Sequence, residues 1–279
     1  MSWRDRPFLA FDTETSGVST ETDRIVTACL GLAGGPQRWS PRNWLFTQAQ
    51  PIPDEATAVH HITTDFANEY GTDPAHNLRE IVDDLYRGWA AGMPVVIYNA
   101  PFDLTILDRE LTRHGLDPLD IRGPVIDPLV LDKATDPYRK GSRKLVDVAR
   151  HYGITLDDAD AHGAEADALT AARVAWKIGA GFLDLDYAME YQAQQYRAQR
   201  ESFARYLAKQ GKTLDDPSTE WPIRTLSPPR RPRPRPERKH DARPHPRPRG
   251  ARRRRHLGLS HHRHQTRHPH PRRHETHRQ

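Results

Sequence analysis

The sequence has a single cysteine, Cys29, so no disulfide can form within the chain. It also has no apolar run near the roughly 18 residues of a membrane-spanning helix, and Asp5 interrupts any signal-peptide pattern. A chain without these features is typical of a reducing compartment. We therefore expect a soluble, cytoplasmic protein with no membrane partner.

The end of the chain has few core-forming residues, because no Val, Ile, Phe, Tyr, Trp, Met or Cys follows Ile223. Residues 224–279 hold 19 Lys and Arg against 3 acidic residues, which leaves 23 basic and 34 acidic residues in 1–223. The net charge is thus −11 before this point and +16 after it. Such a segment cannot bury enough apolar surface to offset its conformational entropy, and we expect 213–279 to be a disordered basic tail.

Three explanations fit the Arg, Pro and His-rich composition of this tail. Dense arginine can neutralise phosphates and release counterions, which would make it a nucleic-acid-binding arm. The histidines could bind metal, although the interrupting Pro and Arg residues give no ligand geometry. The tail could also be a frameshift product, because Arg, Pro, His and Gln share codons that begin with cytosine.

The rest of the chain alternates strand-like and helix-like segments, which is typical of an α/β fold. We expect strands at 8–11, 25–32, 39–46, 94–98 and 125–126 and helices at 77–89, 101–115, 144–151 and 165–178, with a loop at 51–63. Short turns join the first three strands. The pattern predicts a mixed five-stranded sheet, three antiparallel strands then two parallel ones, flanked by helices.

A long amphipathic helix is predicted at 185–210, after the alternating segments. We expect its Tyr and Phe side chains to pack against the rest of the protein or against a partner. The chain would then divide into a folded domain at 1–182, a C-terminal helix at 183–212 and the tail.

Two carboxylates, Asp12 and Glu14, follow the apolar residues of the first predicted strand, in the segment FLAFDTETSG at 8–17. Successive strand residues point to opposite faces, so Asp12 and Glu14 lie on one side, about 7 Å apart. Like charges this close disfavour each other's ionisation unless a cation lies between them. A divalent cation would satisfy both, although acids after a strand also cap turns and helices.

A third carboxylate, Asp103, follows the strand at 94–98 in the first turn of a helix, which Asn99 can cap and Pro101 can begin. Ligand sites gather at the ends of parallel strands, so Asp103 would face Asp12 and Glu14 if the two strands are parallel neighbours. Alternatively, Asp103 only offsets the helix dipole.

A histidine followed five residues later by aspartate occurs twice, as His162 with Asp167 and as His60 with Asp65. The helix that carries Asp167 comes after the whole sheet and can close over the strand ends. His60 is expected in the loop before the first helix. Chain position therefore favours His162 and Asp167 as site residues.

In this order, FDTETSG at 11–17, NAPFD at 99–103, and His162 with Asp167 resemble the three motifs of the DEDDh 3′-to-5′ exonucleases. This family includes the proofreading epsilon subunit of bacterial DNA polymerase III, and the resemblance covers about residues 7–180. It implies a ribonuclease H-like exonuclease domain at 1–182 that releases nucleoside monophosphates from the 3′ end of DNA in proofreading or repair. Two divalent cations are implied, and oxygen ligands suit Mg²⁺ or Mn²⁺.

The resemblance also implies a role for each matched residue. Asp12 would bridge the two cations, with Glu14 and Asp167 completing the site of one. Asp103 would hold the second cation through water, and His162, with an ordinary pKa of about 6.5, would accept a proton from the attacking water. The implied contacts to the terminal nucleotide are Thr15, Gly17, His60, Ile62, Asn99 and Phe102.

Other functions fit the same motifs. Exoribonucleases that act on short RNA resemble them equally, so the choice between DNA and RNA stays open. A catalytically idle module could bind nucleic acid or dock on a DNA polymerase, although the presence of all four acids and the histidine argues against idleness. The implied partners are the 3′ end of single-stranded or frayed DNA, RNA as the alternative, and a DNA polymerase.

Deleting residues 224–279 is expected to leave hydrolysis of short substrates intact and to weaken binding of long strands at low salt, because the tail can add phosphate contacts but no site residue. Rates on a dinucleotide and affinities for a long strand measure the two effects. Loss of all activity on the dinucleotide would contradict this expectation.

Overall fold

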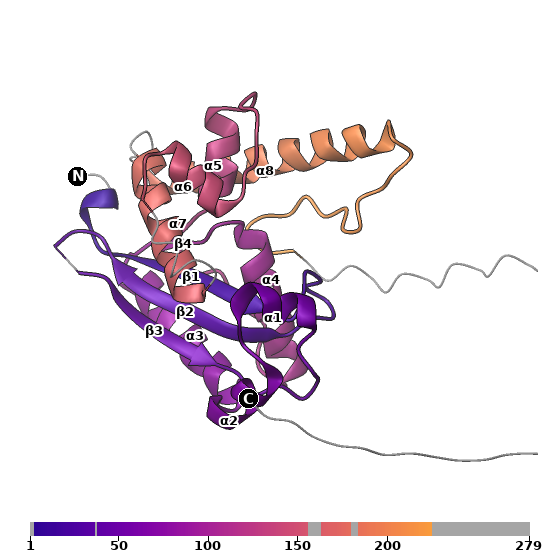
Figure 1. Cartoon of the computed structure of the whole chain (residues 1–279). Helices are drawn as coiled ribbons and strands as arrows, with labels where there is room; N and C mark the ends of the chain where they lie inside the picture. The colour runs from indigo at the N-terminus through magenta and orange to yellow at the C-terminus, as the bar shows by residue number, and fades with distance from the viewer. Residues whose placement is uncertain (1–2, 37, 156–162, 180–183, 225–279) are drawn as a thin grey trace, which may run out of the picture. The chain divides into compact units, whose positions relative to one another are not determined.

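The computed structural model describes residues 3–36, 38–155, 163–179 and 184–224 (Figure 1). Among these residues, no helix is both long enough and apolar enough to cross a membrane. The elements are η1 (Trp3–Asp5), β1 (Phe8–Thr15), β2 (Ile25–Ala33), β3 (Ser40–Leu45), α1 (Asp54–His60), α2 (Thr64–Tyr70), α3 (Pro74–Ala90), β4 (Val95–Val96), α4 (Ala100–Arg113), β5 (Val125–Ile126), α5 (Pro128–Thr135), α6 (Leu145–His151), α7 (Ala164–Ile178) and α8 (Leu185–Ala208).

The strands form one sheet in the order β3-β2-β1-β4-β5. β1 and β3 pair antiparallel with β2, while β4 pairs parallel with β1 and with β5. The predicted mixed sheet is therefore confirmed. Because β1, β4 and β5 run in the same direction, their carboxyl ends lie at the same edge of the sheet, where ligand sites gather in such folds.

The two faces of β1 are covered by different helices, as the alternation of its side chains requires (Figure 1). Leu9 and Phe11 share a core with residues of α3 and α4, whereas Phe8 and Ala10 share one with α7. The buried residues of α7 are mostly alanines, among them Ala168 and Ala171. Their small side chains let this helix lie close to the sheet.

Three local predictions are wrong. Strand β1 continues to Thr15, because the polar residues after Phe11 keep the backbone ladder with β2. The segment 51–63, predicted as a loop, contains α1, and α2 follows at once with the Thr63 hydroxyl accepting from the amide of Phe66. Helix α5 was not predicted, although Asp127 caps it and Pro128 begins it.

Asn99 does not cap α4 with its side chain, contrary to the prediction. It has a left-handed backbone, with φ of 67°, at the residue before the helix. The Asp127 carboxylate instead accepts from the amides of Asn99 and Ala100, each at 3.0 Å. The buried Asp127 carboxylate therefore accepts hydrogen bonds from the N-terminal amides of both α4 and α5. Pro101 occupies the first turn of α4, as predicted.

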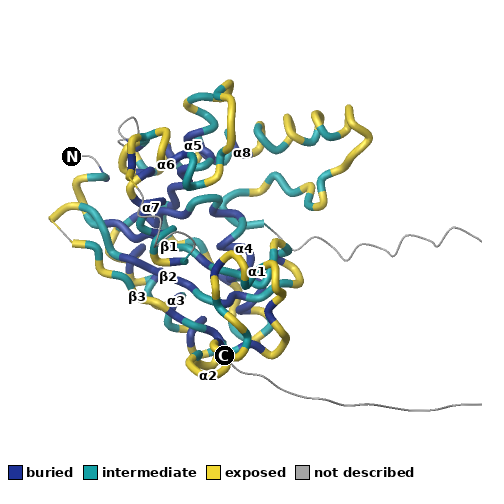
Figure 2. The backbone as a smooth tube through the Cα atoms, in the orientation of Figure 1, coloured by how far each residue is buried: buried dark blue, intermediate teal, exposed yellow. Residues whose placement is uncertain are grey.

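Helix α8 is anchored to the end of β5 by Gln192, whose side chain is fully buried. Its Oε1 accepts from the amide of Asp127 at 2.6 Å, and its Nε2 donates to the carbonyl of Val125 at 3.0 Å. The distal half of α8 is more exposed, as Figure 2 shows. The chain then returns to the core through Trp221 and Ile223. Thus 213–224, grouped with the tail above, is described, and 225–279 lies outside the described residues.

Replacing Gln192 with leucine is expected to lower the free energy of unfolding by about 2 kcal/mol, because the buried amide of Asp127 and carbonyl of Val125 lose their partner. Urea denaturation measures the change. The matched control is Gln194→Ala, which removes an exposed glutamine of the same helix whose side chain donates to Glu190 and to no other described residue. Equal stability of the two variants would contradict the anchoring role of Gln192.

Candidate active site

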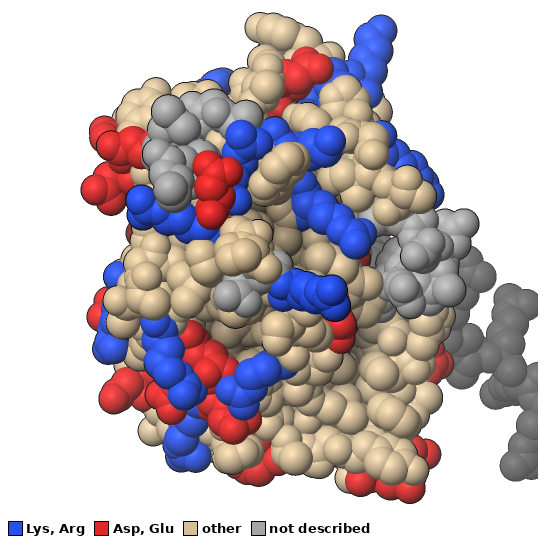
Figure 3. All heavy atoms as spheres, turned by 90° about the vertical axis from the view of Figure 1, so that its left-hand side faces the viewer, with Lys and Arg blue, Asp and Glu red and all other residues tan. Residues whose placement is uncertain are grey.

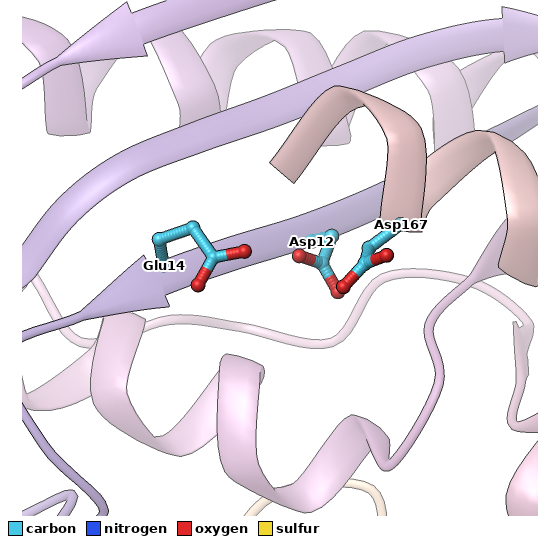
Figure 4. Close-up of side chains that lie close together, drawn as sticks. All are labelled: Asp12, Glu14 and Asp167. Atoms are coloured by element: carbon cyan, nitrogen blue, oxygen red, sulfur yellow. The ribbon is translucent and has the colours of Figure 1, made fainter. Parts of the chain in front are cut away.

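Three carboxylates converge on one side of the sheet, at Asp12 and Glu14 of β1 and Asp167 of α7 (Figure 4). Their oxygens lie within 4.8 Å of one another, and all three residues are half-buried. Asp12 and Glu14 share the face of Phe8 and Ala10, which is the face that α7 covers. The alternation of β1 and the close approach of α7 thus bring the cluster together.

Glu165, in the first turn of α7, connects this helix by hydrogen bonds to the edge strand β3 and to the residue before it. Its carboxylate accepts from Asn43 Nδ2 at 2.6 Å and from Trp39 Nε1 at 3.3 Å. The connection fixes the helix two residues before Asp167. Sequence reasoning missed it, because more than a hundred residues separate the partners and no local pattern marks either of them.

Asp103 approaches from α4, on the face of the sheet opposite to α7. It is buried, and its Oδ1 accepts from the hydroxyl of Thr13 at 2.7 Å and from the Thr13 amide at 3.1 Å. Asp103 lies outside the close cluster of three, although its charge raises the pKa of Asp12. Sequence reasoning missed Thr13, which the same alternation of β1 turns toward α4.

Burial, together with neighbouring negative charges, shifts the pKa values of these acids upward. Burial, followed by the charges of Asp103, Asp167 and Glu14, raises the pKa of Asp12 well above its ordinary value. Burial and the charges of Asp167 and Asp103 raise the pKa of Glu14 to about 8. Burial also raises the pKa of Asp103 to about 7, against the two hydrogen bonds from Thr13, which lower it. Burial and mutual repulsion thus disfavour the simultaneous ionisation of these carboxylates, and added positive charge would favour it.

The donor set fits a divalent cation. Carboxylate oxygens are the ligands that Mg²⁺ and Mn²⁺ prefer, and three of them converge here from two rigid elements. A cation would also relieve the repulsion that raises the pKa values.

A cavity of about 330 Å³ opens beside Glu14, and His60 and Ile62 line it. His60 is buried at the end of α1, not in a loop as predicted, and its Nδ1 accepts from the amide of Ile62 at 3.1 Å. Its buried Nε2 has no hydrogen-bond partner among the described residues. Burial lowers the pKa of His60, so the neutral ring carries its proton on Nε2, as a donor.

The remaining predicted residues lie in different places. The Thr15 hydroxyl donates to the carbonyl of Gly17 at 2.7 Å, in the turn after β1. Phe102 is half-buried in the first turn of α4. Asn99 lines a separate cavity with residues of α5 and α8. His162, predicted as the proton acceptor, lies outside the described residues.

A family model described as an exonuclease, RNase_T, matches residues 9–175. A PolC-type DNA polymerase III of Lacticaseibacillus paracasei is 29% identical over 163 residues, which are 58% of this chain and 10% of that protein. The DNA polymerase III epsilon subunit of Treponema pallidum is 32% identical over 165 residues, covering 58% of this chain and 71% of the relative. The chain thus spans only a small part of the PolC-type enzyme.

Among solved structures, the zinc-bound form of an Escherichia coli exonuclease I complex with single-stranded DNA is similar, with a TM-score of 0.54 and 19% identity. The match covers 72% of this chain and 45% of exonuclease I. At this identity the likeness concerns the fold, and it confirms the predicted ribonuclease H-like architecture.

The metal-free protein is expected to lose stability as pH rises from about 4.5 to about 8. Folding raises the pKa of Glu14 across that range, so the folded state favours the protonated form and loses this contribution as the proton leaves. In EDTA, we expect the Tm to be about 5 °C lower at pH 8 than at pH 5. Millimolar Mn²⁺ should raise the Tm more at pH 8, because cations bind the deprotonated carboxylates.

The variant Glu14→Gln isolates this effect from other titrating groups. It should reduce both the pH dependence and the response to Mn²⁺, whereas Asp65→Asn, which changes an exposed acid on α2, should keep both. The same Tm profile for Glu14→Gln and the unmodified protein would rule out the crowded carboxylates as the cause.

Proposed function

We propose that this chain, which belongs to the RNase_T exonuclease family, is a metal-dependent 3′-to-5′ exonuclease that hydrolyses DNA and releases nucleoside monophosphates. One observation carries this proposal: the carboxylates of Asp12, Glu14 and Asp167 converge within 4.8 Å, with Asp103 close enough to act electrostatically on Asp12. No single motif of the sequence requires this convergence, and hydrolysis assisted by two cations needs it.

Each acid has a proposed role. Asp12, Glu14 and Asp167 would hold one cation, and Asp12 with Asp103 would hold a second. When bound, the cations supply charge that stabilises the attacking and leaving oxygens of the displacement. The Thr13 bonds keep Asp103 oriented and favour its ionised form. His162, directly before the N-cap Gly163 of α7, would accept the proton of the attacking water.

The cavity beside Glu14 is proposed to receive the terminal nucleotide. Ile62 and Phe66 give it apolar walls suited to a base, and the unpartnered Nε2 of His60 can donate to an oxygen of the sugar or phosphate. A neutral imidazole donor is not lost as pH rises above 7, because burial lowers the pKa of His60. Thr15, Gly17 and Phe102 are proposed to border the same nucleotide.

The relatives favour DNA over RNA as substrate. Two of them are DNA polymerase III proteins, and the exonuclease I complex contains single-stranded DNA. A polymerase partner and a proofreading or repair role are proposed on the same ground. The alternative is an exoribonuclease that acts on short RNA, because the acidic cluster itself does not select the sugar.

Asp12→Asn is expected to lower the rate of trimming of a 3′-labelled strand by at least about a thousandfold, because Asp12 is the acid shared by both proposed cation sites. The control is Asp65→Asn, which alters the second aspartate that follows a histidine by five residues and should keep full activity. Digestion of single-stranded DNA, mismatched duplex DNA and short RNA with Mg²⁺ or Mn²⁺ measures both activity and substrate. Equal trimming by Asp12→Asn would refute the site.

A further inference from the structure

A second cavity, of about 190 Å³, lies at the carboxyl ends of β4 and β5, at the end of the sheet where β1 also carries Asp12 and Glu14. Its walls come from four parts of the chain: Asn99 before α4, Lys133 of α5, Tyr196 and Arg200 of α8, and Arg224. Helix α8 and the returning segment therefore complete a cavity that the sheet and α5 begin.

Three cationic side chains line this cavity, and their charges are only partly balanced. Lys133 makes no hydrogen bond or ion pair within the described residues. Arg200 donates to the backbone carbonyls of Asp216 and Ser218, which are neutral groups. Arg224 pairs with the Asp216 carboxylate at 3.0 Å, and its buried Nε has no hydrogen-bond partner among the described residues. The lining thus holds more positive than negative charge.

Asp127 and Asp132, the carboxylates that act electrostatically on Lys133, have other partners. Asp132 binds Arg139 and Arg143 at 2.5 Å each, and Asp127 accepts from the backbone amides that begin α4 and α5. Burial lowers the pKa of Lys133, with Asp127 and Asp132 acting against that shift and Arg143 and Arg200 adding to it. An anion in the cavity would offset the cost of burying this ammonium group.

Polar groups suited to an anion accompany the charges. The hydroxyl of Tyr196 is buried without a hydrogen-bond partner in the part of the chain that the structure describes, and Tyr196 is 6% exposed. Phe203 adds a half-exposed ring at the rim. By contrast, acidic and basic side chains are intermingled on the face drawn in Figure 3. Residues 1–223 carry a net charge of −11, so a cationic cavity is a local exception.

We propose that this cavity binds a phosphate of the nucleic acid strand whose 3′ end occupies the acidic cluster. The inference rests on the proposed exonuclease function and assigns α8 a role in holding the substrate. Asn99, which lines the cavity, and Asp103, which is proposed to hold the second cation, both lie at the N-terminal end of α4. One strand can therefore engage both sites, so that substrates longer than a dinucleotide gain a contact that the dinucleotide lacks.

The test uses Lys133→Gln in the full chain, because Lys133 holds no other part of the fold through a hydrogen bond or ion pair among the described residues. We expect the ratio of kcat/KM for a ten-nucleotide strand to that for a dinucleotide to fall about tenfold, the cost of losing one charge-assisted contact. The slope of log affinity against log salt should shrink by about 0.7, as for one lost phosphate contact. Lys133→Arg should restore most of the ratio.

The control is Lys140→Gln, which removes the same charge from an exposed side chain outside the cavity and should keep the ratio. An unchanged ratio and salt slope in Lys133→Gln would overturn the proposal. Binding of inorganic phosphate or a nucleoside monophosphate that Lys133→Gln abolishes, with strand binding unchanged, would also overturn it in favour of a site for free phosphate.

Fluorescence anisotropy of a labelled ten-nucleotide strand in EDTA separates this inference from the exonuclease proposal. If the unmodified protein cleaves neither substrate, the exonuclease proposal fails, and the anisotropy still measures the cavity. A tenfold weaker affinity of Lys133→Gln, with the affinity of Lys140→Gln unchanged, would then support a strand-binding cavity. Equal affinities of Lys133→Gln and the unmodified protein would exclude it.

Discussion

The crowding of carboxylates at one edge of the sheet is the constraint on which the rest of this structure depends. Asp12, Glu14 and Asp167 lie within 4.8 Å on one face of β1, and Asp103 acts on Asp12 from the other. Unbalanced, these charges oppose the folded state. The fold holds the acids together against their own repulsion, which protonation or a bound cation would relieve.

Several features of the scaffold meet this demand. Alanines let α7 lie close to β1, and Glu165 fixes its first turn to Asn43 and Trp39. Thr13 donates two hydrogen bonds to Asp103 from within β1 itself. One strand thus carries two acids toward α7 and orients a third on α4, so the strand's alternation organises the whole cluster.

The C-terminal segment belongs to the same arrangement. Gln192 joins α8 to β5, and Asp127 at the end of β5 serves the starts of α4 and α5. The neighbouring cavity carries Lys133, Arg200 and Arg224, which contrasts with the acidic cluster. In the proposed function this contrast is useful, because cations would occupy the acidic site while phosphates need a positive one. The net negative charge of residues 1–223 is then no obstacle to nucleic acid.

The sequence by itself predicted a mixed five-stranded sheet, because apolar runs bounded by turns indicate strands and short turns join the first three, whereas the pairing of β4 with β1 was decided by the tertiary structure. It also pointed to Asp12 and Glu14 through strand alternation, to Asp103 through its place after a strand, and to Asp167 through its position in the chain and the family resemblance. The helices α1 and α2, the role of Asp127 in place of Asn99, and the bonds of Thr13 and Glu165 were decided only by tertiary structure. Their partners are distant in sequence, and a hydrogen bond between distant residues depends on packing that no local pattern encodes.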